Sequence, residues 1–262
     1  MTRRPAPGFS CELSGTIASA GFSSGHRFVV GHWVESPIGP LDDVMWARPD
    51  GTRLLLVDRL EAAQLITSVY RFDTVEVLPL RCRMDGAVLV VTAGEGPRQK
   101  SPGPLRPFDL QGSSQNRAGD SATGPELRVS MRGGRRWPIP LSRLRGRAPF
   151  RPLEGLLARG LLGVRTSGVS PTGVQEWYRA DEYRRVVAAQ ARLDGRDLGG
   201  VRGFHEPARF GFSEPPRCPS MVWVRPRLHD PSGRLAEVVA PPGRSDDLPA
   251  EPVSGATVPT DG

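Results

Sequence analysis

The chain has 262 residues, of which 31 are glycine and 27 are proline, and its apolar share of 38% is low for a protein packed along its whole length. The formal net charge of +7 comes from arginine, because Lys100 is the one lysine in the sequence. No run approaches the ~20 apolar residues of a membrane-spanning helix, and the first residues lack the apolar stretch of a signal peptide, so we expect a soluble, unsecreted protein.

The apolar residues concentrate in a few segments, which predicts one α+β domain over residues 26–238. Residues 1–25 and 239–262 are rich in small residues, proline and glycine, and we expect a disordered extension and a disordered tail. Residues 94–125 have the same character and predict a disordered insertion between neighbouring strands.

Strand patterns open the expected domain. Residues 27–35 (RFVVGHWVE) are β-branched and aromatic, and residues 43–48 (DVMWAR) alternate apolar with more polar or flexible side chains. Asp50-Gly51 is typical of a tight turn, and residues 52–57 (TRLLLV) follow it as a third strand. The pattern therefore predicts a β-hairpin.

Asp58 is expected to cap a helix over residues 58–70, because Glu61 follows three residues later and the apolar residues form one stripe. Residues 74–84 predict a strand that Pro79 places at an edge or a bulge. A turn at Asp85-Gly86 then predicts a second hairpin with residues 87–93.

The later elements are a strand over residues 126–132, a short helix over 153–162 and a strand–turn–strand unit over 164–178. Asp181 is expected to cap a helix that continues through Leu193, with Gly195 as its stop. Residues 220–228 predict the last strand. The chain therefore predicts an α+β fold: a mostly antiparallel β-barrel or cone-like sheet with two or three packed helices.

Residues 36–44 (SPIGPLDDV) form a turn with two prolines and one glycine that runs into a strand. This stretch resembles the Ser-Pro-x-Gly-Pro-aromatic-x-Glu-x segment of the acetoacetate decarboxylase-like superfamily, with Leu41 in place of the aromatic residue and Asp43 in place of the glutamate. The resemblance implies a cone-like β-barrel that encloses a pocket for a small organic ligand. A rigid turn that sets the strand register explains the same residues without any function.

The Schiff-base lysine of that family has no counterpart, because Lys100 lies in the expected insertion and a catalytic amine has to be desolvated or placed beside another cation. The resemblance therefore implies a small-molecule-binding protein or an enzyme that works without a lysine. No stretch of the chain carries the signature of a particular reaction.

Five residues are candidates for ligand binding: Asp43, Trp46, Arg165, Trp177 and Arg179. The last three surround one predicted turn, where arginine can hold a carboxylate through paired hydrogen bonds and tryptophan offers an apolar wall. Alternation places Trp177 and Arg179 on one face of a strand and Tyr178 on the other. A core tryptophan with surface arginines is the alternative interpretation.

Other constellations are weaker. Glu35, Asp42 and Asp43 could converge as an acid–base set, although such residues also form solvated turns. His26 and His32 are six residues apart, a spacing that suits no single ion, and no cofactor or metal site is expected. Cys11, Cys82 and Cys218 are far apart and form no C-x-x-C pair, which indicates the reducing cytoplasm.

Residues 127–151 contain eight arginines and no acidic residue. A segment of this kind can neutralise phosphates, so binding of nucleic acid or of an acidic partner is the alternative function. A solvated loop in an arginine-rich sequence explains the same charges.

Overall fold

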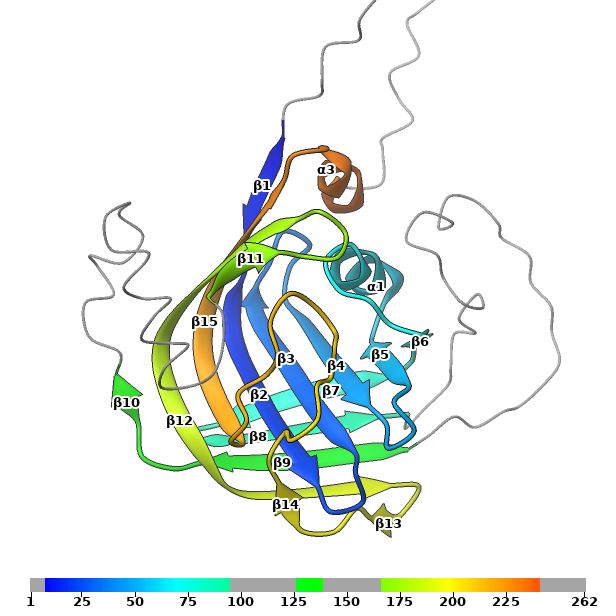
Figure 1. The fold of residues 1–262 in the computed structure, drawn as a ribbon, viewed down its shortest axis with the longest axis vertical. Helices are drawn as coiled ribbons and strands as arrows, with labels where there is room; N and C mark the ends of the chain where they lie inside the picture. The colour runs from blue at the N-terminus through cyan, green and yellow to red at the C-terminus, as the bar shows by residue number, and fades with distance from the viewer. Residues whose placement is uncertain (1–7, 95–125, 139–165, 241–262) are drawn as a thin grey trace, which may run out of the picture.

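The structure is a computed structural model, and it describes residues 8–94, 126–138 and 166–240. Its strands are β1 (Phe9–Glu12), β2 (Ser14–Phe22), β3 (Arg27–Glu35), β4 (Leu41–Ala47), β5 (Arg53–Val57), β6 (Thr74–Val77), β7 (Leu80–Asp85), β8 (Val88–Ala93), β9 (Leu127–Gly133), β10 (Trp137–Pro138), β11 (Ser167–Val169), β12 (Gln175–Leu193), β13 (Arg196–Asp197), β14 (Val201–Arg202) and β15 (Ser220–Asp230). The helices are α1 (Leu60–Thr67) and α3 (Arg234–Val239). The strands form one sheet in the order β6-β5-β4-β3-β2-β15-β12-β9-β8-β7, curled into a half-barrel (Figure 1).

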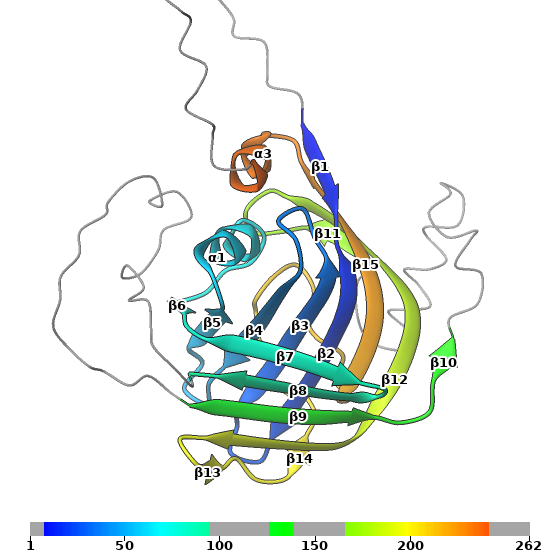
Figure 2. The ribbon, with the colours of Figure 1, turned by 180° about the vertical axis from the view of Figure 1, so that it is seen from behind.

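The long strand β12 joins the two halves of this sheet. Its first half pairs with β15, its second half pairs with β9, and the register shifts at Ala180/Glu182 and at Val186/Ala188. Irregularities of this kind bend a strand and increase its twist. As a result, β7, β8 and β9 run across one face of β2–β5 (Figure 2).

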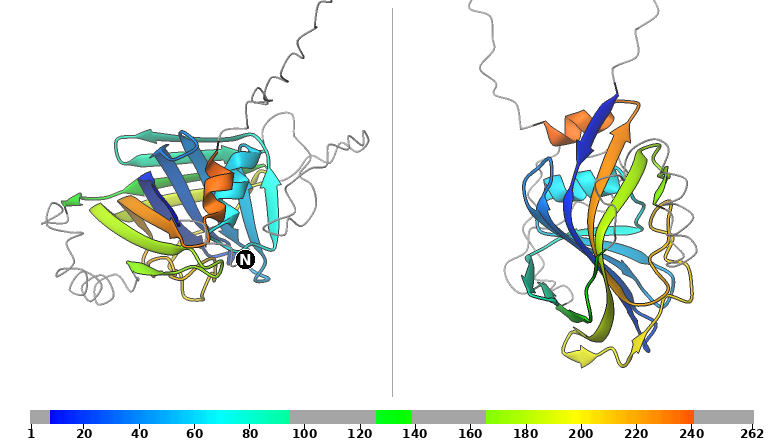
Figure 3. Two further views of the ribbon diagram at one scale, coloured as in Figure 1. Left: turned by 90° about the horizontal axis from the view of Figure 1, so that it is seen from above. Right: turned by 90° about the vertical axis from the view of Figure 1, so that its left-hand side faces the viewer.

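We call the face of β2–β5 and β15 that is turned toward β7–β9 the inner face. It buries one apolar cluster, in which alternate residues of each strand point to the same side: Phe28 and Val30 of β3, Val44 and Trp46 of β4, Leu54 and Leu56 of β5, with Leu89, Val91, Val129 and Met131 opposite them. The opposite face, the outer face, buries a second cluster beneath α1, α3 and residues 204–210 (Figure 3). Because both faces are covered, β3, β4 and β5 are buried along most of their length.

Several expectations are confirmed. The β4–β5 and β7–β8 hairpins are present, Pro79 separates β6 from β7, and β8 pairs directly with β9 across residues 95–125. The pairing is antiparallel throughout the described sheet except between β5 and β6. The cone-like, mostly antiparallel sheet is therefore correct in outline, with two helices among the described residues.

The helix expected over residues 181–193 is wrong, because these residues belong to β12. Alanine, arginine and glutamine favour helices locally, but here the backbone groups pair with β15 and β9. Val186 is buried on the inner face, while Val187, at the register shift, is 57% exposed. Tertiary pairing has overridden local propensity.

The disordered extension expected over residues 1–25 is also wrong for residues 9–22, which form β1 and β2. The strand β2 lies between β3 and β15, and Ala18 and Ala20 are fully buried. Small residues that resemble a disordered composition instead allow close packing at the centre of the sheet.

The cap expected at Asp58 is wrong as well. The N-cap of α1 is Arg59 and has no side-chain cap, while the Asp58 carboxylate pairs with the Arg59 guanidinium. The predictions for residues 95–125, for a helix over 153–162 and for the tail from 241 onward fall outside the described residues. Neither described helix is long and apolar enough to cross a membrane.

Candidate functional site

One end of the inner face carries a line of polar and aromatic side chains, which we call the rim row: Glu182 of β12, Trp223 of β15, Thr16 of β2, His32 of β3 and Asp42 of β4. Each is paired directly with the next across neighbouring antiparallel strands. Directly opposite residues of this kind point to the same face and lie close together. The side chains of His32, Asp42 and Glu182 are 22%, 20% and 19% exposed. These three side chains of the rim row are therefore within reach of solvent.

Beyond the rim row the same face is open and basic. Arg225 pairs with Arg179, and Arg227 pairs with Trp177. The side chains of Arg225 and Arg227 are 50% and 58% exposed, whereas the intervening Pro226 points to the buried outer side. The inner face thus changes from a covered apolar surface, through the rim row, to an exposed surface with several arginines.

The carboxylate of Asp181 lies between two of these arginines. Its oxygens are 3.4 Å from Nε of Arg179 and 3.2 Å from Nε of Arg225. The single negative charge of Asp181 therefore pairs with two guanidinium groups that lie directly opposite each other. Like charges in such positions repel. The local charge is net positive.

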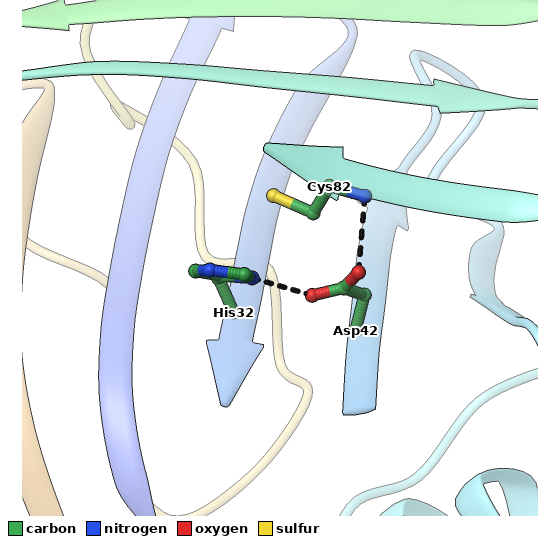
Figure 4. Close-up of side chains that lie close together, drawn as sticks. All are labelled: His32, Asp42 and Cys82. Atoms are coloured by element: carbon green, nitrogen blue, oxygen red, sulfur yellow. Dashed lines mark hydrogen bonds and ion pairs between the residues drawn. The ribbon is translucent and has the colours of Figure 1, made fainter. Parts of the chain in front are cut away.

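Three side chains converge at the β4 end of the rim row, where β7 crosses it (Figure 4). Nδ1 of His32 is 2.6 Å from Oδ1 of Asp42, and the backbone N–H of Cys82 donates to Oδ2 of Asp42 at 3.0 Å. The ligand atoms of His32, Asp42 and Cys82 all lie within 4.8 Å of one another. This group, which we call the His–Asp–Cys cluster, joins three strands.

The charges of the cluster follow from these contacts. The hydrogen bond to Asp42 raises the pKa of His32, against the opposing effect of burial. Burial, followed by the charges of Asp42 and Asp43, raises the pKa of the Cys82 thiol well above its usual range. Without a bound cation, Cys82 is therefore a neutral thiol at neutral pH.

Thr16 sits next to His32 in the rim row and is 1% exposed. Its hydroxyl has no hydrogen-bond partner among the described residues. A buried hydroxyl without a partner costs about 1–3 kcal/mol, so its place between Trp223 and His32 in the rim row indicates a missing partner.

A second group of ionisable side chains lies on the outer face. Asp43 is 1% exposed, and its Oδ1 accepts a hydrogen bond of 2.8 Å from Nε1 of Trp33. Gly31 allows this contact, since a Cβ there would lie 2.2 Å from Oδ1 of Asp43. Burial raises the pKa of Asp43 to about 7, although the Trp33 hydrogen bond opposes the shift.

Glu176 is fully buried on the same side of the sheet. Its Oε2 accepts hydrogen bonds from the hydroxyls of Tyr70, at 3.0 Å, and Tyr178, at 3.1 Å, and these two hydroxyls also contact each other. Burial raises the pKa of Glu176 to about 7. Oδ2 of Asp43 and Oε1 of Glu176 have no hydrogen-bond partner among the described residues.

The five candidates from the sequence do not form one site. Trp177 and Arg179 lie on the exposed part of the inner face, and Tyr178 lies on the other face, as alternation predicts. Asp43 lies on the outer face with Trp33. Trp46 lies deep in the inner cluster, where its Nε1 donates to Nδ1 of His26 at 2.9 Å. Arg165 is outside the described residues.

The expected convergence of Glu35, Asp42 and Asp43 is wrong. Successive residues of a strand point to opposite faces, so Asp42 lies on the inner face and Asp43 on the outer face. Glu35 is exposed at the end of β3. Of the arginine-rich segment, β9 is described, and Arg128 and Arg132 are exposed there, but residues 139–151 are outside the described residues.

Sequence reasoning missed His32 with Asp42, and the contribution of Cys82. The available signal was the β3–β4 hairpin, whose register pairs His32 with Asp42. The sequence of the turn over residues 36–40 does not by itself reveal that register, and a shift by one residue would put a different side chain opposite His32. Cys82 joins the cluster because β7 crosses above this hairpin, and that crossing depends on tertiary packing.

Comparisons with known proteins give structural neighbours only. No family model matches the chain, and no curated protein sequence matches it. One solved structure, described as "Structural Studies of Acetoacetate Decarboxylase", shares 9% identity at a TM-score of 0.37 and covers 87% of this chain and 88% of its own. Acetoacetate decarboxylase from Legionella pneumophila shares 8% identity at a TM-score of 0.34 and covers 88% of this chain and 86% of its own.

Proposed function

We propose that this protein binds a small organic carboxylate at the rim of its inner face. The observation that carries the proposal is the change along that face from covered apolar side chains to the rim row and then to paired arginines. Binding sites for small molecules combine an apolar wall with a few polar groups that fix orientation. The apolar side chains, the rim row and the paired arginines occur here on adjacent residues of neighbouring strands.

Arg179 and Arg225 are the groups that would bind the carboxylate. Guanidinium groups bind carboxylates through paired, charge-assisted hydrogen bonds. These two face each other across β12 and β15 with one carboxylate, that of Asp181, between them. A second negative charge would relieve the repulsion between them.

Trp223 would contact the apolar part of the ligand. It is partly exposed and lies between the buried Met221 and the exposed Arg225 on the same side of β15. An indole ring in this place offers a large rigid surface at low entropic cost. The ligand would therefore lie along β15, with its carboxylate toward the arginines.

The same site could act on its ligand without a lysine. The Asp42 carboxylate holds Nδ1 of His32, and this arrangement orients the imidazole and favours one tautomer. In the metal-free chain, His32 is the residue we assign as a general base if the bound ligand reacts.

Calorimetric titration of the full chain with short aliphatic and aromatic monocarboxylates tests the proposal. Replacing both arginines, Arg179→Gln with Arg225→Gln, is expected to weaken binding by about ten- to a hundredfold, the effect of losing a charge-assisted hydrogen bond. Arg196→Gln, at an exposed arginine of β13, is the matched control and should leave binding unchanged.

Thermal melting of each variant shows whether the fold is retained. If no carboxylate of the panel binds the unaltered chain, or if the double variant binds as tightly, the proposal is wrong.

A further inference from the structure

We propose that the His–Asp–Cys cluster binds one divalent transition-metal ion of the zinc class, with one ring nitrogen of His32, a carboxylate oxygen of Asp42 and Sγ of Cys82 as ligands. Nothing in the sequence pattern indicates this site, because its ligands come from three strands. The proposal goes beyond carboxylate binding and stands whether or not a carboxylate binds at Arg179 and Arg225.

The spacing of the three ligands fits a tetrahedral ion. Bonds of about 2.0–2.3 Å place neighbouring ligands of a zinc ion roughly 3.5 Å apart. The three ligand atoms already lie within 4.8 Å of one another, and the closest pair, His32 and Asp42, is 2.6 Å apart. Side-chain rotations that move these atoms by about 1 Å would complete the geometry.

The types of ligand indicate the class of ion. Imidazole and thiolate together select zinc, cobalt and similar ions over magnesium and calcium, which take oxygen ligands. A divalent ion bound by one carboxylate, one thiolate and one neutral imidazole has no net charge. A neutral centre suits a site that is only about one-fifth exposed.

Thr16 supplies a second, independent observation. Its buried hydroxyl lies beside His32 on the same face and has no partner among the described residues. Three protein ligands leave the fourth position of a tetrahedral ion to water, as in catalytic zinc sites. A hydrogen bond to that water would satisfy the Thr16 hydroxyl.

A Cys–His–Asp nucleophile is the competing interpretation. It requires a hydrogen bond between the thiol and the imidazole, and none joins Cys82 to His32 in the described structure, although both side chains are placed. Sγ of Cys82 instead lies within 4.8 Å of both the His32 nitrogen and the Asp42 oxygen, an arrangement suited to three ligands of one ion. The surroundings of Cys82 therefore favour the metal.

Titration of the full, reduced and chelator-treated chain with Co²⁺ tests the proposal, because a thiolate ligand produces a charge-transfer absorption band. We expect saturation at one equivalent and displacement of the cobalt by Zn²⁺. The variant Cys82→Ser should lose the band, while Cys218→Ser, at an exposed cysteine, should keep it. His32→Gln and Asp42→Asn should each weaken cobalt binding at least about tenfold.

Alkylation of the unaltered chain gives a second measurement that does not depend on how well a variant folds. Zn²⁺ should protect Cys82 from iodoacetamide and leave Cys218 reactive. Absence of the cobalt band, persistence of the band in Cys82→Ser, or no protection of Cys82 would each overturn the proposal. Faster alkylation of Cys82 than of Cys218 in the metal-free chain would identify a nucleophile instead.

Discussion

Replacing Trp46 with alanine is expected to lower the free energy of unfolding by about 3–5 kcal/mol, the usual cost of removing a large buried aromatic side chain. Trp46 is fully buried on the inner face, with its ring 5.5 Å from that of Phe28. The guanidinium of Arg48 lies 4.6 Å from its ring centroid. The alanine variant would leave a cavity at the centre of the inner cluster. It would also remove the indole N–H that donates to His26. Chemical denaturation followed by circular dichroism measures the loss.

Two variants separate the causes. Trp46→Phe keeps most of the apolar contact and removes the N–H donated to His26, so we expect a smaller loss of about 1–2 kcal/mol. Trp137→Ala is the matched control at a tryptophan that is 61% exposed, and it should change stability by less than about 0.5 kcal/mol. A stable Trp46→Ala variant with altered ligand binding would return Trp46 to the role of a ligand-binding residue.

The stability of the protein is expected to fall as pH rises from about 4 to about 7. The folded chain holds Asp43 and Glu176 at pKa values of about 7, above the ordinary range of a carboxyl in the unfolded chain, near 4. Between these limits the folded state keeps protons that the unfolded state releases, so each unit of pH favours unfolding. Each group contributes on the order of a few kcal/mol that is fully present below about pH 4 and lost by about pH 7.

Urea denaturation at a series of pH values from about 4 to about 8 measures this dependence. The double variant Asp43→Asn with Glu176→Gln mimics the protonated groups and should flatten the curve. Asp85→Asn, at an exposed carboxyl, is the control and should leave its slope unchanged. His32, whose pKa is also raised, adds a loss in the same direction and remains in every variant. Equal slopes in the double variant and the unaltered chain would show that the two carboxyls ionise normally.

The sequence predicts most of the strands of β3–β5 and β7–β9, because there local signals and tertiary structure agree. Asp50-Gly51 and Asp85-Gly86 give tight turns, and the strands beside them are rich in β-branched and apolar residues. Fold class follows from those hairpins. The sequence could not reveal that β12 would join the two halves of the sheet.

The predictions of a helix at β12 and of disorder at β2 are wrong for the same physical reason. β12 contains strong helix formers, and only its pairing with β15 and β9 makes it a strand. β2 contains small residues because it is packed closely: a Cβ on Gly15 would lie 2.2 Å from the carbonyl oxygen of His32. In both segments the deciding partner is distant in sequence, and composition alone indicates the opposite structure.

The candidate site was predictable only in part. Trp177 and Arg179 were chosen for their chemistry and do lie near the rim row. Arg225, which pairs with Arg179, comes from a strand about 45 residues later that is paired directly with β12. The His–Asp–Cys cluster depends on a hairpin register and on the crossing of β7. Packing between strands sets both the register and the crossing. The alternation pattern of a single strand carries no information about either.

The central claim, that the rim of the inner face is a ligand site, is tested most directly by the five tryptophan indole N–H signals in an NMR titration with the tightest-binding carboxylate. Trp177 and Trp223 lie at the rim, Trp46 is in the inner cluster, Trp33 is on the outer face and Trp137 is exposed on β10. We predict saturable shifts of the Trp223 and Trp177 signals while the other three stay in place. Shifts confined to Trp33 or Trp137, with Trp223 and Trp177 unchanged, would contradict the account.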